Sequence, residues 1–150
     1  MKLSIDDYPF GSRQSDVPIF GVREIDADHL DLQNHYRALL RALRDGKGVT
    51  AFGLSFYSFL RRLRQHFESE EVLMKRINFP DRKAHKAEHD KLMADAEDFL
   101  SSVLSRFEKY DCSAVAKYFG YWLLDHVDHY DRALALSLQQ AEHEERAAVV

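Results

Sequence analysis

The amino-acid sequence predicts an all-α protein, an antiparallel up-down-up-down four-helix bundle with an N-terminal arm. Apolar residues recur at spacings of three and four along four long stretches, which is typical of helices that bury one face. Proline and glycine are scarce, at 3 and 6 residues, and no stretch alternates strictly between apolar and polar residues as a strand would. We expect the arm over residues 1–20 and the bundle over residues 21–146, because short connections between long helices favour antiparallel neighbours.

The first two helices are expected over residues 26–45 and 50–77. Asp26 or Asp28 is expected to cap the first, and Gly46 to end it. The segment Asn78-Phe79-Pro80 is expected to end the second, because proline and the residue before it disfavour helix. The inward stripes are Ile25, His29, Leu32, Tyr36, Leu39 and Leu43 in the first helix, and Phe52, Phe56, Phe59, Leu63, His66, Glu70 and Leu73 in the second.

The third and fourth helices are expected over residues 81–110 and 113–145. Asp81 follows Pro80 as a cap for the third, and Asp111 or Ser113 would cap the fourth. The inward stripes are His85, His89, Leu92, Ala96, Phe99 and Val103 in the third helix, and Val115, Phe119, Trp122, His126 and Ala133 in the fourth.

Composition and charge exclude several classes of function. A formal net charge of -4 argues against a nucleic-acid-binding surface, which is usually basic. No stretch reaches the roughly 18 consecutive apolar residues of a membrane span, and the acidic start, with Asp6 and Asp7, does not resemble a secretory signal. The single cysteine, Cys112, cannot form an internal disulfide, which fits a reducing cytoplasm. We therefore expect a cytoplasmic protein that contacts neither nucleic acid nor membrane.

Polar residues on the apolar stripes indicate a metal site. Buried carboxylates without partners are costly, and five histidines converging with two carboxylates call for cations between them. Imidazole and carboxylate together suit iron, manganese and zinc. These residues are His29, His66, Glu70, His85, His89, His126 and Asp131.

The spacing supports a shared site for two pairs and leaves a third open. His66 and Glu70, like His85 and His89, are four residues apart and therefore share a helix face. His126 and Asp131 are five apart, about 140° around a regular helix, so Asp131 would have to reach sideways. By spacing alone, His129 with Asp125 or His126 is an equally good choice in the fourth helix.

The order and separation of these motifs resemble those of the hemerythrin family, in particular its single-domain bacterial members. The resemblance covers roughly residues 19–135. The matching pieces are Gly21-Val22 with Ile25-Asp26 and His29, His66-Phe67-Glu68-Ser69-Glu70-Glu71 with Met74, Phe79-Pro80 with His85-Lys86-Ala87-Glu88-His89, and Trp122-Leu123 with His126-Val127 and Asp131.

The resemblance implies two iron ions, joined by a solvent-derived oxo or hydroxo bridge, that bind dioxygen reversibly for storage, delivery or sensing. It assigns His85, His89 and His126 to one iron, His29 and His66 to the other, and Glu70 and Asp131 as bridges. The second iron then keeps an open position, for which Leu32, Phe67, Trp122 and Leu123 are the expected apolar surroundings. The sequence departs from the family in lacking a tryptophan in the arm, in carrying Asp28 where glutamine often precedes the first histidine, and in the extra His129.

Other functions stay open at this point. The expectation is a binding protein and not an enzyme, because the Glu-x-x-His pairs of carboxylate-rich di-iron oxidases do not occur in the sequence. The alternatives are a di-iron oxidase, peroxidase or nitric oxide reductase, a nitric oxide-binding or regulatory module that signals through a partner protein, and a zinc or manganese site. Arg61, Arg62 and Arg64 are expected on a solvated face, and Glu71 on the surface.

Overall fold

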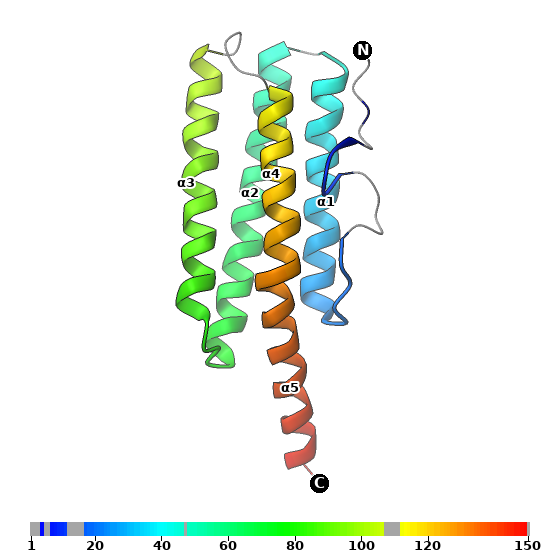
Figure 1. Ribbon diagram of the computed structural model, residues 1–150, viewed down its shortest axis with the longest axis vertical. Coiled ribbons are helices and arrows are strands. Elements are labelled where there is room, and N and C mark those ends of the chain that lie inside the picture. The colour runs from blue at the N-terminus through cyan, green and yellow to red at the C-terminus, as the bar shows by residue number, and fades with distance from the viewer. Residues whose placement is uncertain (1–3, 5–6, 12–16, 47, 107–111, 150) are drawn as a thin grey trace.

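Four long helical rods lie side by side and successive rods run in opposite directions (Figure 1). The computed structural model describes residues 4, 7–11, 17–46, 48–106 and 112–149, and over these residues it contains no strand. The elements in chain order are α1 (Arg23–Arg44), α2 (Gly48–Arg76), α3 (Arg82–Arg106), α4 (Cys112–His126), η4 (Val127–Asp131) and α5 (Arg132–Ala148). The predicted all-α antiparallel bundle is confirmed, and no described helix has the length and apolar character of a membrane span.

The first helix begins at Arg23, three residues before the predicted start. The prediction that Asp26 or Asp28 is the N-cap was wrong, because that position falls on Val22. Asp26 instead accepts hydrogen bonds from the backbone N–H groups of Phe20 (2.9 Å) and Gly21 (3.0 Å), in the chain before the helix. It therefore stabilises the entry into the helix from within the first turn.

The predicted helix ends are largely confirmed. Gly46 follows α1 with a φ of 60°, a left-handed conformation that glycine adopts without a steric penalty. Asn78 has a φ of 51° after α2, and the N–H of Phe79 returns to the carbonyl of Met74 at 2.9 Å. The predicted end of the third helix at Tyr110, the side chain of Val103 and the alternative cap Asp111 lie outside the described residues.

The sequence predicted that the fourth rod is one regular helix, and this prediction was wrong. A π-helical turn, η4, separates α4 from α5 and adds one residue to the turn after His126. Beyond this turn the buried positions are Leu134, Ala135 and Leu138, whereas Ala133 is exposed. The prediction of Ala133 in the inward stripe was therefore wrong, because the extra residue shifts the helical phase by one position.

The apolar core forms two clusters with a polar layer between them. The larger cluster is built around Tyr36, Phe56 and Phe119, and Tyr8 and Phe10 of the arm are buried in it. The smaller cluster lies toward the other end of the bundle and consists of Ile25, Met74, Phe79, Leu134, Ala135 and Leu138. Along each rod, the polar residues of the predicted metal site fall between residues of these two clusters.

Candidate metal centre

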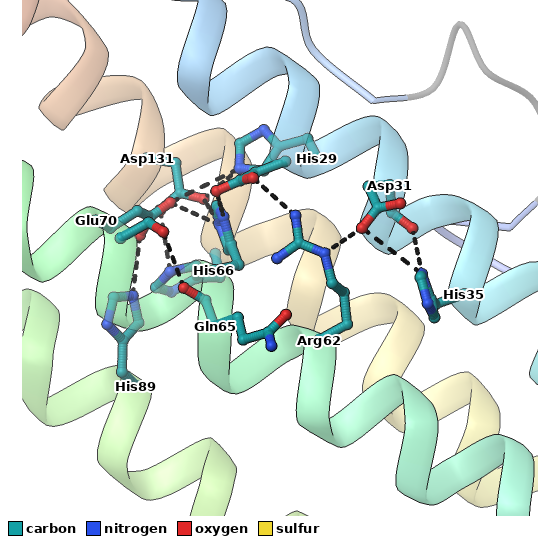
Figure 2. Close-up of polar contacts among 12 residues, drawn as sticks. His29, Asp31, His35, Arg62, Gln65, His66, Glu70, His89 and Asp131 are labelled. Atoms are coloured by element: carbon teal, nitrogen blue, oxygen red, sulfur yellow. Dashed lines mark hydrogen bonds and ion pairs between the residues drawn. The ribbon is translucent and has the colours of Figure 1, made fainter.

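The structure brings all seven predicted ligands together in the interior. None of them has more than 3% of its surface exposed, although each is polar or ionisable. Figure 2 shows His29, His66, Glu70, His89 and Asp131 converging from different helices. Their donor atoms form two overlapping groups, each compact enough to surround one ion.

Regular helix geometry places four of the seven. His66 and Glu70 lie one turn apart on α2, and their side chains approach to 2.7 Å between Nε2 and Oε1. His85 and His89 lie one turn apart on α3, with ring centroids separated by 4.5 Å. Both pairs follow directly from the rule that residues four apart share a helix face.

The π turn places Asp131. In a π turn the backbone hydrogen bond joins residues five apart, so Asp131 comes to the same face as His126. Their side chains meet at 3.1 Å between His126 Nε2 and Asp131 Oδ1. The competing choice from spacing does not reach the interior, because 67% of the His129 side chain and 78% of the Asp125 side chain are exposed and the two pair with each other at the surface.

Both carboxylates divide their two oxygens between the two groups. Oε2 of Glu70 lies 3.1 Å from Nε2 of His85 and 3.1 Å from Nε2 of His89, whereas Oε1 lies 2.7 Å from Nε2 of His66. Oδ1 of Asp131 faces His85 at 3.0 Å, and Oδ2 faces Nε2 of His29 at 2.8 Å. A carboxylate with one oxygen toward each of two groups has the geometry of a bridge between two ions.

The donor separations match those around a metal ion. With metal–ligand bonds of about 2.1 Å, neighbouring donors of an octahedron lie about 3.0 Å apart. The contacts from Glu70 and Asp131 to the nearest histidines span 2.7–3.1 Å, and Nε2 of His85 and His126 are 3.3 Å apart.

Several of these buried atoms lack a hydrogen-bond partner. Both oxygens of Glu70 and the Nε2 atoms of His66 and His89 make no hydrogen bond of acceptable geometry within the described part of the chain. Buried polar atoms are otherwise nearly always paired. Lone pairs that are close together but not aimed at one another are what a shared cation satisfies, so this donor set fits metal ions.

The ionisation of the cluster shows the same need for positive charge. Burial alone would raise the pKa of Asp131, but the His126 imidazole and hydrogen bonds from neighbouring histidines hold it well below its usual range. Burial and the negative charge of Asp131 would raise the pKa of Glu70, but the nearby imidazoles of His66 and His29 hold it well below its usual range. Burial would lower the pKa of His85, yet its hydrogen bond to Asp131 and the nearby carboxylate of Glu70 raise it to about 9. The metal-free cluster therefore holds protons that a cation would displace.

Two histidines are anchored from behind by carboxylates on neighbouring helices. Nδ1 of His66 lies 3.2 Å from Oδ2 of Asp28, and Nδ1 of His89 lies 3.3 Å from Oε1 of Glu71. Glu71, which was expected on the surface, has 29% of its side chain exposed and in addition contacts His89. Asp28, the residue that departs from the family pattern, supplies the other anchor.

Arg62 also differs from its predicted role on a solvated face. Its side chain is 19% exposed and forms ion pairs with Asp28 and Asp31, whereas Arg64 on the same helix is 52% exposed. Figure 2 shows Arg62 reaching toward the cluster, with Asp31 and His35 on its far side. The spacing held a signal for this contact, since Asp28 precedes His29 and Arg62 lies one turn before His66, but periodicity alone does not say which helices touch.

Aromatic rings surround the three-histidine side. The ring of Phe67 stacks on His89 at 3.9 Å, and Trp122 stacks on His126 at 4.6 Å. Tyr130 covers the other side of His126 at 5.3 Å, a role that the sequence did not suggest. Of the residues expected around an open position, Phe67 and Trp122 thus pack mainly on the three-histidine group.

The two-histidine side has a thinner aromatic cover. Phe20, an aromatic residue of the arm, presents its edge to His29 at 6.1 Å. Leu32 and Leu123 are both buried in the large apolar cluster, with Leu32 one turn beyond His29 on α1. His29 is therefore flanked by the arm residue Phe20 and, one turn further along α1, by Leu32.

Comparison with known proteins agrees with the geometry. The family model of the hemerythrin HHE cation-binding domain matches residues 21–135, which include all seven clustered residues. A search among curated proteins and a search among solved structures each found no match. Because the family model covers most of the chain, this protein belongs to the hemerythrin HHE cation-binding domain family.

Proposed function

We propose that this protein binds dioxygen reversibly at a pair of iron ions. In this proposal His85, His89 and His126 hold one ion, His29 and His66 hold the other, and Glu70 and Asp131 bridge the two together with a solvent-derived oxo or hydroxo group. Mixed imidazole and carboxylate ligation suits iron. The proposal is supported by the two overlapping donor groups, which share only Glu70 and Asp131.

The observation that carries the proposal is the unequal number of histidines on the two sides. Three nitrogens, two carboxylate oxygens and a solvent bridge would fill six positions around one ion. Two nitrogens, two carboxylate oxygens and the same bridge would fill five around the other, on the side of His29 and His66, where the donor group has two histidines in place of three. A redox-active iron pair would supply an open coordination position for a diatomic ligand and the electrons that hold it.

The chain itself contributes enclosure and orientation. Helix packing fixes all seven side chains in a layer closed by two apolar clusters, so bulk water has little access to the site. Exclusion of water and protons favours release of the bound ligand unchanged over its loss in a reduced form. The histidine-rich donor set and the absence of Glu-x-x-His pairs from the sequence favour binding over oxygen-activating catalysis.

The test loads metal-free protein anaerobically with ferrous iron, admits air, and records iron content and the visible spectrum. We expect about two irons per chain and a charge-transfer band that appears in air and disappears under argon. His66→Ala should abolish the band. His129→Ala removes an exposed histidine outside the cluster and should retain it.

Each remaining outcome of this experiment contradicts the proposal in a distinct way. Two irons without a reversible band, or steady oxygen consumption in the presence of a reductant, would favour a di-iron enzyme. A response to nitric oxide alone would favour a nitric oxide-binding module. Failure to bind iron, with zinc or manganese bound instead, would remove the di-iron assignment.

A further inference from the structure

We propose that Asp28, braced by Arg62, is a positioning residue for His66 and thereby adjusts the ion on the two-histidine side. The inference rests on the metal centre proposed above, and its test separates the two. Asp28 and Arg62 belong to neither donor group, and they connect α1 to α2 directly behind a histidine of the cluster.

The contacts of Asp28 define a fixed orientation for its carboxylate. Oδ2 lies 3.2 Å from Nδ1 of His66, and Oδ1 lies 2.8 Å from Nη2 of Arg62. Arg62 is held in turn, because its Nε donates to the carboxylate of Asp31. The side chains of Asp28 and Arg62 are 23% and 19% exposed, so their ion pair is largely shielded from solvent, whereas 43% of the Asp31 side chain is exposed.

The direction of the hydrogen bond follows from ligation. His66 points Nε2 into the cluster, 2.7 Å from Glu70, so Nε2 is the atom available to a metal. The proton of the neutral ring then resides on Nδ1 and is donated to Asp28. A carboxylate that accepts this proton fixes the tautomer and ring orientation and makes the ring a more basic ligand.

Each side of the centre has one histidine that is supported in this way. The Nδ1 atoms of His66 and His89 face Asp28 and Glu71, whereas those of His29, His85 and His126 have no hydrogen-bond partner among the described residues. Each group of donors therefore contains one histidine anchored by a carboxylate. The pair Asp28→Asn and Glu71→Gln removes the negative charge of one anchor on each side while nearly conserving side-chain volume.

A matched control exists on the same helix as Arg62. Arg64 lies two residues further along α2 and forms an ion pair with Glu97, and both of these side chains are 52% exposed. Arg62→Gln and Arg64→Gln change the net charge equally. Arg62→Gln alone disrupts the contact that orients Asp28.

The experiment uses zinc as a diamagnetic probe. Zinc affinities come from chelator competition on the full-length protein, histidine ring protons are followed by proton–nitrogen correlation spectra, and folding of each variant is checked by circular dichroism. Asp28→Asn should weaken one of the two zinc equivalents roughly ten- to a hundredfold and shift the hydrogen-bonded Nδ1 proton signal of His66, because a neutral amide oxygen is a weaker acceptor than a carboxylate. Arg62→Gln should weaken the same equivalent to a smaller extent, Glu71→Gln should weaken the other, and Arg64→Gln should match the wild type.

Reduction potentials of the iron-loaded protein supply an independent measurement. Removing the carboxylate behind His66 makes the ring a poorer donor to the ferric state, so Asp28→Asn should shift the potential upward while Arg64→Gln does not. The inference is overturned if folded Asp28→Asn binds both zinc ions as tightly as Arg64→Gln and leaves the His66 Nδ1 proton signal unshifted. A wild-type protein that binds no metal would instead overturn the proposed metal centre itself.

Discussion

From the π turn after His126 we predict that two single-residue deletions, of His129 and of Asp125, have different effects. His129 lies within this turn, and its exposed imidazole contacts Asp125. Deleting His129 leaves His126 and Asp131 four positions apart, which an ordinary α-helix places on one face. We expect the turn to become α-helical, with both side chains still in the cluster and the protein still able to bind two metal ions.

Deletion of Asp125 is the matched control, because it removes the other half of the same surface ion pair. Here the helix cannot keep both His126 and the preceding core residues in place, since one missing residue rotates the two parts by about 100° relative to each other. If the core before the deletion turns, Phe119 and Leu123, each 1% exposed, lose their burial. At about 1.5–3 kcal/mol per side chain the loss is about 3–6 kcal/mol. If that core stays, His126 leaves the metal site.

The assay compares thermal or urea unfolding of the two metal-free variants and their metal content after loading. The His129 deletion should unfold near the wild-type midpoint and hold two metal ions. The Asp125 deletion should either unfold several kcal/mol more easily or lose a metal ion. Equal damage from both deletions would refute the argument that the π turn is a single-residue insertion that keeps Asp131 in register.

Three further predictions follow from the buried cluster and from the packing of the arm. Glu70→Gln should reduce metal content at both positions, because each oxygen of Glu70 faces one donor group; elemental analysis showing two ions still bound would contradict the bridging geometry. Metal affinity should fall as pH falls from about 9, by up to about tenfold per pH unit for His85 alone. The hydrogen bond to Asp131 and the nearby Glu70 carboxylate overcome the effect of burial and raise the His85 pKa to about 9, so metal binding must release this proton. Calorimetric zinc titrations at several pH values would test this, and a pH-independent affinity would count against it. Gly120→Ala should destabilise the protein by about 1–3 kcal/mol, as overpacking usually does. The new Cβ would lie 2.4 Å from the Tyr36 hydroxyl and 2.4 Å from a backbone oxygen of the arm. Urea denaturation measures this change, and a free energy of unfolding equal to or above that of the wild type would show that the arm can move aside.

The sequence by itself was sufficient for the bundle and for most of the cluster. Burial of one stripe per helix is a local property of spacing, so the positions of His66 with Glu70 and of His85 with His89 follow from the chain alone. Gly46 and the Asn78-Phe79-Pro80 segment predicted where the first two helices end, and the left-handed backbones of Gly46 and Asn78 confirm these ends. The resemblance to a family then assigned chemistry to positions that spacing had already placed on one face.

Tertiary structure decided the features that depend on how one helix meets another. Spacing left Asp131 and the pair of Asp125 with His129 as equal choices, and only the π turn, which keeps α5 packed in a shifted phase, places Asp131 inside. The contacts of Asp28 with His66 and Arg62 join α1 to α2 and depend on the rotation of both helices. Periodicity defines which face of a helix is buried, but the rotation and register between helices come from packing the whole core, and these determine which carboxylate oxygen faces which histidine.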